Sequence, residues 1–168
     1  IYTITHFLIH KTKLLNRYTK SFHLDEKIHF PSDFDQKMSN IEAEIGIIQL
    51  DKYDKIISLR RRQAKKYLDE FRDSKLLQFN NFEKGATFSH LPVIVPDKDF
   101  FIKGMIKYGV DIGEVIQYSI PNLSCYEHLK YDCKNAEYAS KHTINLPLGE
   151  NIDVEKICKK IKAFLMND

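Results

Sequence analysis

The spacing of apolar residues divides the first part of the chain into helical and irregular stretches. Over residues 4–18, apolar side chains recur every three or four positions between lysines and arginines, a spacing typical of an amphipathic helix. Residues 19–37 have no sustained period and are interpreted as a connector. Ser39 and Glu42 then form a capping-box pattern, so a long helix is expected after them, with an apolar stripe that continues to Phe71.

A glycine lies within this apolar stripe. Gly46 in a helix interior costs about 1 kcal/mol relative to alanine, so its presence calls for a structural reason. Two reasons remain open from the sequence. Either another backbone approaches the helix closely at this position, or a bend divides the segment into two helices.

Shorter elements are expected in the middle of the chain. Residues 88–95 favour a strand, and Pro92 within it indicates an edge position or the start of the strand. Pro96 and Asp97 are typical of a helix start, and the helix is expected to run to Tyr108 and to stop at Gly109. The residues expected to face inward from this helix are Phe101, Ile102, Met105 and Ile106.

The last part of the chain continues the alternation of helices and strands. The expected elements are a strand over 110–118 interrupted by Gly113, a polar loop over 122–134, a short helix over 135–141, a strand over 143–146 and a helix capped by Asp153. This order predicts an α+β fold, in which a small antiparallel or mixed sheet carries helices on one face.

Composition narrows the classes of function. The length of 168 residues fits one domain, and no apolar run is long enough for a membrane-spanning helix. The 26 basic and 23 acidic residues leave a net charge of +3, too small and scattered to favour nucleic acid as a partner. The cluster Arg60–Arg62 is interpreted as a solvated helix face, with an anionic ligand left open. The chain begins at Ile1 without methionine, so we expect it to be part of a longer polypeptide.

Candidate chemistry is sparse. Three cysteines without a CxxC pair favour neither a disulfide framework nor a zinc site, and they fit a reducing, cytoplasmic setting. His6 and His10 lie four residues apart, but no carboxylate or cysteine at a matching offset supports a metal site. No glycine-rich phosphate-binding motif occurs. The residue chemistry alone therefore predicts an α+β domain without an identifiable catalytic centre.

A series of ordered segments between residues 35 and 165 adds information that composition lacks. The first reads KMSNIEAEIGIIQL at 37–50, and arginine, alanine and tyrosine follow at Arg61, Ala64 and Tyr67. The later ones are GV with a downstream tyrosine and proline over 109–121, CKNAE at 133–137 and NLPL at 145–148. Together these segments resemble the C-terminal small domain of the DegT/StrS family of pyridoxal-phosphate (PLP) dependent nucleotide-sugar aminotransferases.

The resemblance implies a fold-type-I aminotransferase, usually a cytoplasmic homodimer, that passes an amino group through PLP to a nucleotide-linked keto sugar for polysaccharide biosynthesis. It implies that residues 1–36 are a helix and connector from a missing N-terminal domain and that residues 37–168 are the small domain. The lysine that binds PLP covalently belongs to the missing large domain in that family. The chain alone is therefore expected to bind no cofactor and to be inactive, and to dimerise or dissolve poorly through apolar surface left uncovered.

The resemblance also implies roles for individual residues. Asp35 lies where the family commonly has an asparagine that helps to hold the PLP phosphate of the partner subunit. A carboxylate only accepts hydrogen bonds, so it would repel the phosphate unless Lys37 compensates. His90, Gln117 and Tyr118 lie where the family lines its substrate cleft, although a packed aromatic is the alternative for Tyr118. Because of Asp35, a non-catalytic relative that binds a nucleotide sugar or a protein partner remains the second hypothesis.

Overall fold

The computed structural model describes residues 35–79 and 85–167, so the helix expected over residues 4–18 lies outside the described residues. The α+β fold class is confirmed. Three short strands form one antiparallel sheet in the order β1 (Gln78–Phe79), β2 (Pro92–Ile94) and β3 (Thr143–Asn145). In register, Val93 of β2 lies between Phe79 of β1 and Ile144 of β3. Pro92 begins a central strand, so the start position was the correct alternative and the edge position was wrong.

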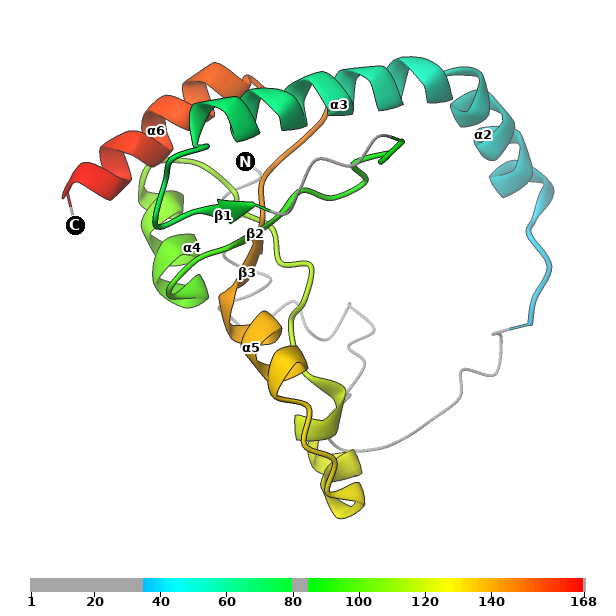
Figure 1. Ribbon diagram of the computed structural model, residues 1–168. Helices are drawn as coiled ribbons and strands as arrows, with labels where there is room; N and C mark the ends of the chain where they lie inside the picture. The colour runs from blue at the N-terminus through cyan, green and yellow to red at the C-terminus, as the bar shows by residue number, and fades with distance from the viewer. Residues whose placement is uncertain (1–34, 80–84, 168) are drawn as a thin grey trace.

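Helices cover the sheet and extend beyond it. They are α2 (Asn40–Asp51), α3 (Tyr53–Glu70), α4 (Lys98–Lys107), α5 (Lys134–His142) and α6 (Val154–Asn167), with 3-10 turns η1 (Ile120–Asn122) and η2 (Ser124–Leu129). Figure 1 shows α3 and α6 together on one side of the sheet, with α4 beside it and α5 leading away from it. Within the described ranges, no helix has the length and apolar character needed to cross a bilayer.

The predicted helix start at Ser39 is confirmed. The Ser39 side chain accepts from the backbone N–H of Glu42, and the Glu42 carboxylate accepts from the backbone N–H of Ser39 at 2.8 Å. The segment divides into α2 and α3 at Lys52, not at Gly46. The predicted division into two helices is therefore confirmed, but it does not lie at the glycine. Within the described residues nothing lies within 4 Å of a Cβ built at Gly46, so no other described backbone approaches it closely.

A single hydrophobic core lies between the helices and the sheet. The stripe of α6 points into it as predicted, and Asp153 caps that helix by accepting from the backbone N–H of Lys156 at 3.0 Å. The most deeply buried core residues come from every layer: Ala64, Tyr67, Val93, Met105, Ile144, Leu146 and Ile161. Of the arginine, alanine and tyrosine that follow the first family segment, Ala64 and Tyr67 therefore belong to the core.

Buried polar groups of α3 hold the connection between β3 and α6. The Gln63 side chain donates to the carbonyls of Gly149 (2.8 Å) and Ile152 (3.1 Å) and accepts from the N–H of Gly149 (2.9 Å). The Tyr67 hydroxyl donates to the carbonyl of Pro147 at 3.2 Å. Because these groups are hydrogen-bonded, their burial carries no unpaired-group penalty.

The helix predicted after Pro96 is confirmed, with one exception on its inward side. The Asp97 side chain caps α4 by accepting from the N–H of Phe100, and Gly109 follows the helix with a φ of +66°. Phe101 and Met105 are buried, but Ile106 is 48% exposed, so its assignment to the core was wrong. Each helical residue turns by about 100° from the last, so the residue after Met105 leaves the core face.

The strand predicted over 110–118 does not form. Gly113 alone pairs with Asn145, through N···O distances of 3.0 and 2.8 Å, as an isolated bridge beside β3. The apolar alternation that favoured a strand reflects the burial of Val110 and Ile112 beside the core. The predicted polar loop over 122–134 was also wrong in part, because η1 and η2 occupy its first half. The strand β1 was not predicted.

We predict that Gly104→Ala destabilises the domain. An added Cβ would lie 2.3 Å from Cε2 of Phe164, a buried ring that packs edge-on against Phe101. Overpacking of about 1–3 kcal/mol should outweigh the gain of about 1 kcal/mol in helix propensity, so the free energy of unfolding in urea should fall. Gly46→Ala is the control, since open space surrounds that position. Equal stability of Gly104→Ala and the unmodified chain would refute this packing.

Candidate functional site

One asparagine brings the predicted substrate-contacting segments together. The Asn145 side chain accepts from the backbone N–H of Leu91 at 2.8 Å, and the Asn145 backbone forms the bridge with Gly113. His90 directly precedes Leu91, and the segment that carries Gln117 and Tyr118 begins at Gly113. The two segments are therefore held to the same residue of β3.

The side chains of this candidate site are exposed to solvent. His90 and Gln117 are exposed, and Tyr118 is 41% exposed, so it is not a fully packed aromatic in this chain. The next residue, Ser119, is buried, and within the described part of the chain its hydroxyl has no hydrogen-bond partner. The site is a polar surface segment with its aromatic ring accessible.

A buried lysine lies directly behind this segment. The Lys98 ammonium is 2.9 Å from a carboxylate oxygen of Glu114 and donates to the carbonyl of Ile116 at 3.3 Å. The Lys98 side chain is 8% exposed and that of Glu114 is 38% exposed. Sequence reasoning missed Lys98. The signal that could have identified it is a lysine in the first turn of a helix, where acidic residues are preferred.

The predicted cofactor contacts lie elsewhere. Asp35 and Lys37 are exposed on the extended segment before α2. Figure 1 places that segment past the end of α3 that is distant from α6 and the sheet. A phosphate needs several converging donors, whereas the described residues offer here a cation beside an acceptor-only carboxylate. Asp35 and Lys37 therefore lie on a different part of the described fold from His90, Gln117 and Tyr118.

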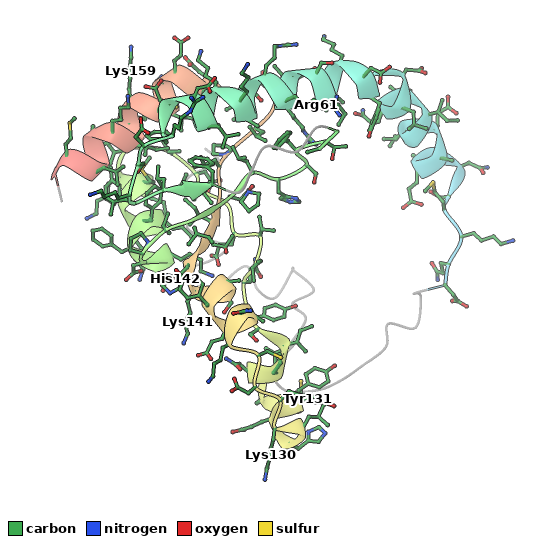
Figure 2. The ribbon with its side chains drawn as sticks, viewed as in Figure 1. Arg61, Lys130, Tyr131, Lys141, His142 and Lys159 are labelled. Atoms are coloured by element: carbon green, nitrogen blue, oxygen red, sulfur yellow. The ribbon has the colours of Figure 1, made fainter. Side chains whose placement is uncertain are left out.

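The basic cluster on α3 has a structural role through one of its members. Arg61, labelled in Figure 2, donates to the carbonyls of Ala86 (2.8 Å) and Gly85 (3.0 Å). This bidentate contact fixes the turn that leads toward His90. Arg61 and Arg62 are both exposed, as a solvated helix face requires, and Arg61 in addition holds this turn.

The titratable groups with large pKa changes lie in the core and not at this site. Burial raises the pKa of the Tyr67 hydroxyl, and burial raises the pKa of the Cys158 thiol to about 11. Both groups therefore stay protonated near pH 7. Over the described ranges, no three or more His, Cys, Asp or Glu residues gather where they could hold a metal ion. His6 and His10 lie outside the described residues.

The fold defines the class of protein. A small antiparallel sheet backed by helices, with a long helical segment leading into it, is a fold that this chain shares with part of fold-type-I aminotransferases. The chain belongs to the DegT/DnrJ/EryC1/StrS aminotransferase family, whose model matches residues 7–164.

Solved structures share this fold at low sequence identity. PseC from Helicobacter pylori, an aminotransferase involved in the biosynthesis of pseudoaminic acid, is 20% identical with a TM-score of 0.69 over 95% of this chain and 47% of that chain. Spr1654 from Streptococcus pneumoniae, in a PLP form, is 22% identical with a TM-score of 0.65 over 76% and 35%. The sugar aminotransferase CalS13 from Micromonospora echinospora is 18% identical with a TM-score of 0.65 over 73% and 34%.

These comparisons set the limits of what the chain contains. It spans about a third to a half of the length of the similar structures. No curated protein sequence matches it significantly. The comparisons therefore establish the family and the fold.

We predict that Cys158 resists alkylation in the native chain while Cys133 reacts. Cys133 is exposed, whereas Cys158 is buried with its pKa raised to about 11, so at pH 8 its thiol is protonated as well as covered. Mass spectrometry after treatment with iodoacetamide measures the labelling of each cysteine. Unfolding in guanidinium provides the control, because both thiols should then react. Rapid labelling of Cys158 in the native chain would disprove its burial.

Proposed function

We propose that this chain supplies the small domain of a PLP-dependent aminotransferase that acts on a nucleotide-linked keto sugar in polysaccharide biosynthesis. Its family membership supports the aminotransferase class. The involvement of PseC in the biosynthesis of pseudoaminic acid supports a sugar substrate. In this proposal residues 37–168 are the small domain, residues 1–36 lead from the large domain, and the enzyme works as a cytoplasmic homodimer.

The observation that carries the proposal is the exposed apolar surface of α2. None of the residues of this helix, all of which are described, is buried. Ile41 is 75% exposed and Leu50 is 70% exposed. The other large apolar side chains left exposed in and beside the helix are Met38, Ile45, Ile47 and Ile48.

A helix with apolar residues on all sides is a buried helix in a stable protein, because water around such a surface is unfavourable. The chain covers only 34–47% of the similar structures. We therefore infer that the large domain of the family packs against α2 in the assembled enzyme. In Figure 1 this helix extends away from the sheet.

In the assembled enzyme, the large domain would hold PLP, which supplies the electron-withdrawing ring that amino transfer requires. The residues of this chain would bind and orient the sugar. Gln117 and His90 offer hydrogen-bonding groups, and Tyr118 offers an aromatic ring and a hydroxyl. Lys37 would offset the charge of Asp35 beside the phosphate held by the partner subunit.

A second candidate rests on Asp35. An exposed carboxylate at the position of an amide donor opposes a phosphate, so a relative that has lost transfer and retains binding of a nucleotide sugar or a protein partner would tolerate it. PLP binding separates this candidate from the first one.

We predict that the polypeptide joined to the large domain binds PLP and transfers an amino group from glutamate to a nucleotide-linked keto sugar, whereas residues 1–168 alone do neither. Asp35→Asn should tighten PLP binding by about tenfold, because removing a repulsion of about 1.4 kcal/mol changes an equilibrium by that factor. Asp51→Asn, an exposed change at the other end of α2, is the control. A joined polypeptide that binds no PLP, with or without Asp35→Asn, would overturn the enzyme and favour the second candidate.

We predict that residues 1–168 alone self-associate through α2. The double variant Ile45→Lys with Ile48→Lys should be monomeric in light scattering, with an unchanged thermal midpoint because α2 contributes nothing buried to the core. Ile106→Lys, at an exposed isoleucine of α4, should leave the association intact. A monomeric unmodified chain at high concentration would contradict the apolar-surface account.

A further inference from the structure

We propose that Lys98 is a positioning residue whose buried ammonium group holds the segment of Gln117 and Tyr118 in its binding conformation. This inference rests on the proposed function, since it assigns a support to the same site. Lys98 need not contact the substrate. It acts through the segment that does.

The location of Lys98 is not explained by the stability of α4. It is the first residue of the helix, where the dipole of the helix disfavours a positive charge. Asp97 already caps this end through the N–H of Phe100. The whole residue is only 6% exposed, and a buried ammonium is costly unless charged and polar partners surround it. The buried ammonium of Lys98 must therefore be stabilised by charged and polar groups outside α4.

Among the described residues, the polar partners of the Lys98 ammonium lie on the segment that leads to the candidate site. The ammonium is 2.9 Å from the carboxylate of Glu114 and donates to the carbonyl of Ile116 at 3.3 Å. One cation thus binds both a side chain and the backbone of residues 114–116. The Ile116 carbonyl belongs to the peptide group that joins Ile116 to Gln117. The hydrogen bond from Lys98 therefore fixes the backbone directly before the exposed site residues.

Two further hydrogen-bonded contacts hold this segment, one at each end. At the start, Gly113 pairs with the backbone of Asn145. At the end, the carbonyl of Ser119 accepts from the N–H of Asn122 at 3.0 Å in the turn of η1. Between these two points the segment belongs to no strand of the sheet. The contacts of Lys98 are the support that lies closest to Gln117.

Loss of the ammonium would remove the polar contacts that hold residues 114–116 between the two ends of the segment. Gln117 and Tyr118 would then sample several positions, and substrate binding would have to order them. That cost weakens binding of the substrate while the chemical step, which belongs to groups of the large domain, keeps its rate. A rise in KM with an unchanged kcat is therefore the expected signature of Lys98→Met.

The order of the segment can be measured without any substrate. Chymotrypsin cleaves after exposed tyrosines in mobile backbone, so the rate of cleavage after Tyr118 reports the freedom of this segment. Tyr131, at the far end of the described fold in Figure 2, provides an internal reference in the same chain. In the polypeptide joined to its large domain, Lys98→Met should raise cleavage after Tyr118 by about tenfold relative to cleavage after Tyr131.

The control is Lys103→Met, which removes an exposed lysine from the same helix and should leave the ratio unchanged. Lys98→Arg, which keeps the charge, should restore most of the protection. If Lys98→Met does not fold, Glu114→Gln tests the same contact from its exposed side and should raise the ratio by a smaller factor. An unchanged cleavage ratio in the folded Lys98→Met or Glu114→Gln variant would overturn the role of Lys98.

Kinetics complete the test and separate this proposal from the proposed function. With a nucleotide-linked keto sugar as the varied substrate, Lys98→Met should raise KM by about tenfold and change kcat by less than about twofold. A loosened segment with an unchanged KM would also overturn the proposal. If the unmodified enzyme shows no transfer, the proposed function fails, and the cleavage ratio alone then decides whether Lys98 holds the segment.

Discussion

The packing of α3 against the connection between β3 and α6 is the interaction on which the rest of this domain depends. The strands are two or three residues long, and a sheet of that size does not persist in water without a covering layer. Gln63 provides this support with three hydrogen bonds to residues 149–152, and Tyr67 adds one to Pro147. Because these bonds are made inside the core, they fix the position of the chain that follows β3.

The geometry of the candidate site depends on these contacts between α3 and the connection from β3 to α6. Asn145 lies at the end of β3, two residues before Pro147, and joins the segments of His90 and Gly113. Lys98 approaches the same region from α4. The exposed polar side chains of the site are thus carried by a rigid frame of buried contacts, while α2 stands outside that frame with its apolar surface uncovered. The domain is organised around the sheet, and α2 has no buried residue.

Sequence reasoning succeeded where the determinants are local. The caps at Ser39, Asp97 and Asp153 each involve a side chain and a backbone N–H three residues away, so a short pattern is sufficient to predict them. Gly109 after α4 was predicted for a similarly local reason, because its positive φ is a conformation that glycine adopts readily. The segments that carry the family resemblance, 37–50 and 145–148, correspond to α2 and to the end of β3.

Sequence reasoning failed where a distant partner decides the outcome. The two-residue strand β1 exists only because β2 lies beside it, and no local pattern predicts that pairing. Val110 and Ile112 alternate like a strand because both are buried in the core, but in this segment Gly113 alone pairs with the sheet, as an isolated bridge. The burial of Lys98 and the linking role of Asn145 depend on contacts separated by many residues, so the resemblance could name His90, Gln117 and Tyr118 but not the groups that hold them.

The measurement that tests the central claim most directly is hydrogen exchange along α2 and α3, with and without the large domain supplied in the same or in a separate chain. We expect the amides of α2 to exchange rapidly when residues 1–168 are kept monomeric by Ile45→Lys with Ile48→Lys. In the unmodified chain joined to the large domain they should be protected by at least about a hundredfold, whereas the amides of the buried half of α3 should change little. Strong protection of α2 in the isolated monomer, or no gain from the large domain, would contradict the claim that this chain is the small domain of a larger aminotransferase.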